Sequence, residues 1–146
     1  MAQPASTFPA DHRASAPRGA AVALLVLLLA IAAWAFAWPV VRAFVDVEIL
    51  ANEGWNAYFA DAVFGPAPLY PPRDELITNN YPPLSFVLVA LLSRWIGDPV
   101  LAGRLVSLVA VLAVALWIAL AVRRLGGSRA GAFVAAAWFV ATMARF

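Results

Sequence analysis

The segment from Ala20 to Val41 contains no charged side chain and is rich in leucine, alanine and valine. As an α-helix it would be about 33 Å long, since each residue adds roughly 1.5 Å. That length is enough to cross the hydrocarbon core of a bilayer, which is about 30 Å thick. Hydrophobic residues make up 64% of the chain and charged residues 12%, against about 45–50% and about 25% in soluble domains. We therefore predict a membrane protein whose first spanning helix is residues 20–41.

Three further apolar segments predict that the chain enters the membrane more than once. Residues 100–122 are long enough for a second full span, whereas residues 84–96 would reach only about 20 Å as a helix. The apolar segment 130–146 runs to the end of the sequence without a polar tail. We interpret it as the start of another membrane helix in an incomplete chain. The predicted fold class is all-α, with polytopic membrane helices.

The N-terminal residues 1–19 are rich in proline and small polar residues, a composition typical of a disordered tail. Arg13 and Arg18 precede the first apolar segment, and residues 35–37 (Ala-Phe-Ala) have the small-x-small pattern of a signal peptidase site. A cleaved signal peptide is therefore the alternative to an uncleaved anchor. We favour the anchor because the apolar segment is long and further spans follow it.

The placement of arginine predicts which side of the cell (inner) membrane each segment faces, since basic residues are retained in the cytoplasm. The tail carries two arginines, whereas residues 42–83 carry two arginines and six acidic residues. We therefore place the tail inside and residues 42–83 outside, as an extracytoplasmic loop. If residues 84–96 cross the membrane, Arg123, Arg124 and Arg129 fall outside, against the rule. If they form a re-entrant or interfacial helix, the cluster falls inside, and the sequence allows both.

Several kinds of site are excluded by residue types that the chain lacks. It has no cysteine, and therefore no disulfide, thiolate nucleophile or cysteine-based zinc site. Its one histidine, His12, lies in the tail, so a metal site would need oxygen ligands. The arginines stand at the ends of apolar segments and form no basic patch, so we expect no nucleic-acid partner.

The loop of residues 42–83 is the most polar part of the chain after the tail. Between about residues 49 and 64 the large apolar side chains recur at helical spacing and the polar ones fall largely on another face. This pattern predicts an interfacial helix that lies along the membrane surface. Farther on, Asn79-Asn80-Tyr81 precedes two prolines at the start of the next helix. Helix N-termini attract anions, so we consider a lipid-linked phosphate as a ligand there.

Glu53 is the loop carboxylate to which we assign the main chemical role. It lies beside Trp55 at a partly desolvated interface, so we expect its pKa to be raised toward a value useful for a general base. A leaving phosphate needs positive charge nearby, and Arg42 and Arg73 are the local candidates. Arg104, one turn into the 100–122 segment, is interpreted as a side chain that only snorkels to the membrane interface.

Three motifs, taken in order, resemble a known family. They are Asn-Glu-Gly-Trp-Asn-Ala-Tyr (52–58) after the first apolar segment, Tyr-Pro-Pro-Leu (81–84), and Arg-Arg-Leu-Gly (123–126) at the end of a later one. Their order and spacing resemble the N-terminal part of the C-type membrane glycosyltransferases. These include the protein O-mannosyltransferases and the bacterial aminoarabinose transferases, which use sugars carried on polyprenyl phosphates. The resemblance covers the chain from about residue 20 to its end.

The resemblance implies sugar transfer at the outer face, in which a loop carboxylate acts as general base or binds a divalent metal ion. An acceptor hydroxyl would attack the anomeric carbon. Many members carry an Asp-Glu pair where this chain has Asn52 and Glu53. An amide cannot act as a base, so Glu53 would take the role, with Asp46 or Glu48 replacing the missing acid. Tyr81 stands where many relatives have a basic or histidine residue.

The predicted site lies within the loop of residues 42–83. Its catalytic residues are Glu53, Asp46 and Glu48, and its substrate-binding residues are Asn52, Trp55, Tyr58, Tyr70, Asn79, Asn80, Tyr81, Arg42 and Arg73. The expected partners are the lipid bilayer and a polyprenyl-phosphate-linked sugar. Relatives have further spans that complete the lipid-binding groove, so we expect this chain alone to be inactive. The alternative function is a non-enzymatic membrane subunit or transporter fragment whose loop binds a partner.

Overall fold

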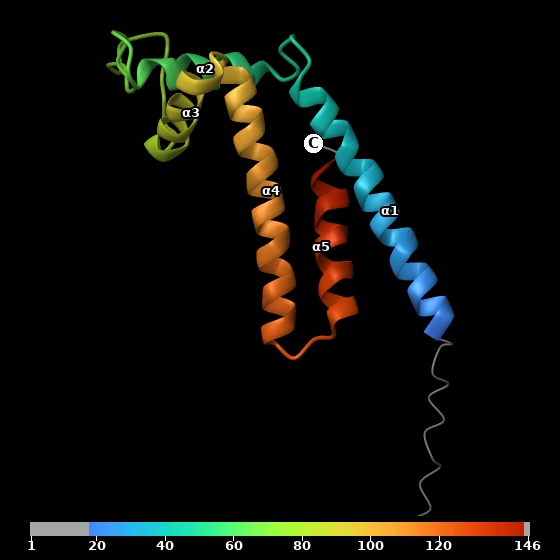
Figure 1. Cartoon of the computed structure of the whole chain (residues 1–146). Helices are drawn as coiled ribbons and strands as arrows, with labels where there is room; N and C mark the ends of the chain where they lie inside the picture. The colour runs from blue at the N-terminus through green and yellow to red at the C-terminus, as the bar shows by residue number, and fades with distance from the viewer. Residues whose placement is uncertain (1–17, 145–146) are drawn as a thin grey trace, which may run out of the picture.

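A computed structural model of the protein describes residues 18–144, and within that range the chain forms five α-helices and no strand (Figure 1). The helices are α1 (Arg18–Ala43), α2 (Ala51–Ala62), α3 (Pro83–Ile96), α4 (Pro99–Arg124) and α5 (Arg129–Met143). The all-α prediction is confirmed. The predicted disordered tail lies outside the described residues, apart from its last two positions, which begin α1.

The helix boundaries lie close to the predicted ones. The helix predicted at about 49–64 occupies Ala51–Ala62, and the short apolar segment predicted at 84–96 forms α3, which begins one residue earlier. Two helices, Gly19–Ala43 and Pro99–Arg124, are long and apolar enough to cross a membrane by length and composition. The helices α3 and α5 are apolar but shorter.

Local sequence signals set most of these boundaries. The Asp98 carboxylate accepts hydrogen bonds from the backbone N–H groups of Val100 (2.8 Å) and Leu101 (3.2 Å), which caps α4. The Ser128 hydroxyl caps α5 by accepting from the Gly131 N–H at 3.0 Å. Gly97 ends α3 with a φ of 85°, a left-handed conformation that favours glycine.

The helices α1, α4 and α5 lie alongside one another, whereas α2 and α3 gather at the end where α1 finishes and α4 begins (Figure 1). The segment that joins α4 to α5 lies at the opposite end, near the start of α1. Arg123, Arg124 and Arg129 belong to that far end. The helix α3 packs against α2 and the start of α4, and it stays at the α2 end of the molecule.

The interior of the long helices is built from small side chains. Buried positions on α1, α4 and α5 are alanines: Ala32, Ala43, Ala102, Ala115, Ala132 and Ala137. Many of the leucines, valines and tryptophans on the same helices point outward instead. Small residues allow helix backbones to approach closely, which is how helices associate when the surroundings are themselves apolar.

Phe59 forms the one large, fully buried side chain among the described residues. Its ring makes edge contacts with Trp55 and Tyr58 on its own helix, with centroids 5.1 and 5.2 Å apart. It also packs against Phe86 of α3 at 5.8 Å. This aromatic cluster fixes α2 on α3, and so positions the face of α2 that carries Glu53.

Candidate functional site

A cavity of about 750 Å³ lies where the end of α1, α2, the start of α3 and the first half of α4 meet. Met143 and Ala144 at the end of α5 also line it. Its walls are mainly apolar. The polar side chains come from α1, α2, α3, α4 and the segment just before α3: Arg42, Asn52, Glu53, Asn56, Tyr81, Ser85, Arg104 and Ser107. Binding sites for small molecules usually have about this volume and this mixture of apolar walls with a few polar groups.

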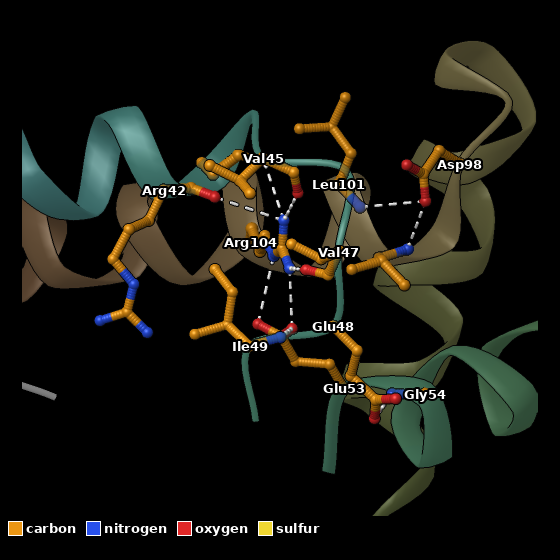
Figure 2. Close-up of polar contacts among 12 residues, drawn as sticks. Arg42, Val45, Val47, Glu48, Ile49, Glu53, Gly54, Asp98, Leu101 and Arg104 are labelled. Atoms are coloured by element: carbon orange, nitrogen blue, oxygen red, sulfur yellow. Dashed lines mark hydrogen bonds and ion pairs between the residues drawn. The ribbon is translucent and has the colours of Figure 1, made fainter. Parts of the chain in front are cut away.

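Arg104 on α4 forms most of the side-chain hydrogen bonds in the polar part of this cavity (Figure 2). Its Nε donates to Glu53 Oε1 at 3.1 Å and its Nη2 to Glu53 Oε2 at 2.8 Å, which makes a bidentate ion pair. Nη1 also donates to the backbone carbonyl of Val45 (2.6 Å), and Nη2 to that of Val47 (2.7 Å). One guanidinium therefore joins α4, α2 and the linker between α1 and α2.

Glu53 is held from a second direction by its own helix terminus. Its Oε2 accepts the backbone N–H of Ile49 at 2.8 Å, while its own backbone N–H donates to the Leu50 carbonyl at 2.9 Å. Glu53 lies in the first turn of α2, and its side chain thus reaches back to the residue before the N-cap, Leu50, whose own side chain makes no capping hydrogen bond. Glu48 assists by accepting the Gly54 N–H at 3.0 Å.

The hydrogen bonds from the Arg104 guanidinium lower the pKa of Glu53 below its ordinary value of 4.5. Partial burial acts in the opposite direction but is the smaller effect, and the Ile49 N–H adds to the lowering. The prediction of a raised pKa is therefore wrong. It took account of desolvation beside Trp55 but not of an arginine supplied by a distant helix. At neutral pH Glu53 is a carboxylate that accepts hydrogen bonds on both oxygens.

The interpretation of Arg104 as a snorkelling side chain is also wrong. Its side chain is 12% exposed and that of Glu53 is 20% exposed, so the pair lies largely within the protein. A charged side chain near the start of an apolar helix is costly unless it is paired. The presence of an arginine at position 104 therefore indicated that it has a partner. The sequence offered no signal for the identity of the partner, because Glu53 lies 51 residues away.

Arg42 is the other cationic residue of the cavity. Figure 2 shows its side chain extending away from the Arg104 guanidinium, although its backbone carbonyl is 3.3 Å from Arg104 Nη1. The side chain is half-buried and lines the cavity. Within residues 18–144 its guanidinium forms no hydrogen bond or ion pair, so its donors can reach a ligand.

The structure brings only some of the predicted site residues together. Asn52, Trp55 and Tyr81 line the cavity with Glu53 and Arg42. The remaining residues lie outside that lining: Asp46, Glu48, Tyr58, Tyr70, Arg73, Asn79 and Asn80. The polar lining residues that were not predicted are Asn56, Ser85, Arg104 and Ser107.

Tyr70 and Asn79 form hydrogen bonds within the proline-rich loop, residues 66–83. The Tyr70 hydroxyl donates to the Tyr81 carbonyl at 2.9 Å. The Asn79 side chain donates to the Leu69 carbonyl and accepts the Tyr81 N–H, both at 3.0 Å. These bonds fix the backbone of Tyr81 just before α3 begins. Tyr81 lines the cavity, so Tyr70 and Asn79 affect the cavity indirectly, by holding one of its lining residues in place.

The carboxylates of the described region are spread out. Among residues 18–144, no group of three acidic or histidine side chains lies close enough together to hold a metal ion. Glu53 is the one acidic side chain in the cavity lining.

No protein-family model, curated protein or solved structure matches this chain. The resemblance to C-type membrane glycosyltransferases therefore rests on the three sequence motifs and their order.

Proposed function

We propose that this chain is part of an integral membrane glycosyltransferase that moves a sugar from a polyprenyl-phosphate donor to an acceptor hydroxyl at the outer face of the membrane. The observation that carries the proposal is the cavity beside α1 and α4. It combines apolar walls with a single carboxylate, Glu53, and with the Arg42 guanidinium. Apolar walls suit a polyprenyl chain, and an arginine suits its phosphate.

In the proposed reaction the acceptor oxygen forms a bond to the anomeric carbon as the bond between that carbon and the phosphate oxygen breaks. The electron pair of the broken bond leaves with the phosphate, whose added charge Arg42 stabilises. The hydroxyl proton passes to Glu53. Because its pKa is lowered, Glu53 is ionised and ready to accept a proton but is a weak base. Proton transfer is therefore expected late, once the acceptor oxygen has begun to bond to carbon.

The proposed topology places α1 and α4 across the membrane and α2 on its outer surface. Because α3 stays at the α2 end, we propose that it enters the outer leaflet without crossing. Arg123, Arg124 and Arg129 then lie in the cytoplasm with the start of α1, as the placement of basic residues requires. The proposed location is the cell membrane, with the N-terminus inside.

A second candidate function follows from the bonding of Glu53. Both of its oxygens are engaged by N–H donors of the protein, which is what a purely structural carboxylate would show. In this alternative the chain is a non-enzymatic membrane subunit or a transporter fragment. The cavity then holds a lipid without transforming it, and the loop binds a partner.

Substitution of Glu53 by glutamine in the full-length protein separates the two functions. Glu53→Gln removes the base but keeps the shape of the side chain, so transfer from a radiolabelled polyprenyl-phosphate sugar should fall by about 10²-fold or more. Glu75→Gln is the matched control, because Glu75 is exposed and lies outside the cavity lining. Asp46→Asn tests the supporting acid and should have a smaller effect. Wild-type transfer by folded Glu53→Gln would refute catalysis and favour the subunit.

A further inference from the structure

We propose that Arg104 is a positioning residue, which fastens Glu53 to the linker between α1 and α2 and holds it charged and oriented for proton transfer. This inference rests on the proposed function, because it assigns Glu53 a proton to accept. Arg104 itself contacts neither phosphate nor acceptor in this scheme. Its role is carried through Glu53 and through the backbone of residues 42–47.

The hydrogen-bond donors of Arg104 are already used within the protein. A guanidinium carries five N–H groups: one on Nε and two on each Nη. Nε and one Nη2 N–H go to Glu53, the other Nη2 N–H goes to Val47, and Nη1 goes to Val45, with Arg42 and Ala43 carbonyls at 3.3 and 3.4 Å. No donor is left to bind an anion unless one of these bonds breaks. The anion-binding role in the cavity therefore falls to Arg42.

The acceptors around Arg104 match the shape of a guanidinium group. The two carboxylate oxygens of Glu53 face the planar fork of Arg104, while the carbonyls of Val45 and Val47 approach its other edge (Figure 2). A lysine has three donors on a compact ammonium group and cannot span both sides. The geometry thus requires arginine specifically, rather than any positive charge.

Several charged side chains lie in the region around Glu53. From α4 it faces Arg104, and from the end of α1 it shares the cavity with Arg42. The linker contributes Asp46 and Glu48, and Asp98 caps α4 nearby. Asp46 and Asp98 act electrostatically on Arg104. Within the described residues, Arg104 is the one cation bonded to Glu53. Because its hydrogen bonds lower the pKa of Glu53, its removal should allow Glu53 to take up a proton at higher pH.

The kinetic test compares Arg104→Gln, Arg104→Lys and Arg42→Gln in the full-length protein, with polyprenyl-phosphate sugar as donor. Arg104→Gln should lower kcat by about 10- to 100-fold, because the base is misplaced. It should move the acidic limb of the pH profile to higher pH and leave the donor KM within about twofold. Arg104→Lys should lie between the wild type and Arg104→Gln. Arg42→Gln should raise the donor KM and also lower kcat, because Arg42 contacts the phosphate and stabilises its added charge, but it should leave the acidic limb in place.

Arg94→Gln is the matched control, because it removes the same charge from an arginine that lies 4.8 Å from the Phe64 ring, away from Glu53. It should leave the acidic limb in place. If Arg104→Gln keeps the wild-type pH profile, or changes the donor KM alone, the inference is overturned.

A second measurement does not depend on activity. A hydrophobic carbodiimide reacts with protonated carboxyl groups, and mass spectrometry of the full-length protein locates the label at Glu53. In Arg104→Gln and, to a smaller extent, Arg104→Lys the labelling of Glu53 should begin at higher pH than in the wild type. An unchanged labelling profile in folded Arg104→Lys and Arg104→Gln overturns the inference.

The two proposals fail in different ways. Wild-type transfer by Glu53→Gln would remove catalysis from Glu53, and with it the part of this inference that concerns proton transfer, whatever the labelling shows. Loss of transfer in Glu53→Gln, together with unshifted labelling in the Arg104 variants, would leave the proposed function standing and reject the role of Arg104.

Discussion

Phe59→Ala should loosen the contact between α2 and α3 and thereby open one wall of the cavity. Phe59 has no exposed surface, and its ring is the one large side chain of the described region that is fully enclosed. Truncation of such a residue to alanine usually costs about 3–5 kcal/mol, which includes the lost transfer free energy and the void left behind. The contacts with Trp55 and Tyr58 lie within α2, whereas the contact with Phe86 joins two helices. That last contact is the one that matters for the position of α2.

Thermal unfolding of the purified full-length protein in detergent, followed by tryptophan fluorescence, measures the effect. At about 2–4 °C per kcal/mol for a protein of this size, Phe59→Ala should lower the unfolding midpoint by about 6 °C or more. Phe59→Leu keeps most of the apolar volume and should cost less than about 1.5 kcal/mol.

Phe64→Ala is the matched control for this experiment. Phe64 is exposed by 53% and its main partner is the Arg94 guanidinium, so the loss should be about 0.5–1 kcal/mol. If Phe59→Ala lowers the midpoint no more than Phe64→Ala does, Phe59 is not the core of the α2–α3 contact and the reasoning is refuted.

Three other predictions concern a helix cap, pH and topology. Asp98→Ala should lower the free energy of unfolding by about 1 kcal/mol through loss of the α4 cap, whereas Asp98→Asn should retain most of it; equal midpoints for the alanine variant and the wild type would contradict this. Because the folded-state pKa of Glu53 is lowered, its stabilising effect is fully present above its ordinary pKa of 4.5 and is lost as pH falls below that value. Unfolding midpoints of the wild type and Glu53→Gln should therefore converge in acid, and a constant difference would argue against the ion pair. In a chain without cysteine, Asp74→Cys and Ser128→Cys should react with an impermeant maleimide from opposite sides of the membrane; labelling from the same side would mean that α3 crosses it.

The helices were predictable from the sequence because long apolar segments and the helical spacing of side chains are patterns that can be read locally. The uncharged stretch at residues 20–41 lies wholly inside α1, and α2 begins and ends within two residues of the predicted limits. Proline and glycine mark the boundaries of α3 and α4 through fixed backbone preferences, which act locally. These features need no knowledge of the tertiary structure.

The bonding within the site was not predictable in the same way. Glu53 was found because it belongs to a motif, but its partner Arg104 lies on a helix that no sequence pattern connects to it. That missing contact reversed the expected direction of the Glu53 pKa. Tyr70 and Asn79 show the converse case. Their side chains are used within the proline-rich loop, and composition does not distinguish a polar group that braces a loop from one that meets a ligand.

The distance of 51 residues between Glu53 and Arg104 also orders the events of biosynthesis. At about 5–20 residues per second, roughly 3–10 s pass between the synthesis of the carboxylate and that of its arginine. During that interval α2 can already pack on α3 through Phe59 and Phe86, but the helix that carries its arginine has not yet been made. In the proposed topology, the ion pair forms only when α4 has been inserted with its N-terminal end beside the linker between α1 and α2. A chain that inserted α4 in the opposite orientation would leave Glu53 without its arginine, so this one contact also distinguishes the correctly assembled protein.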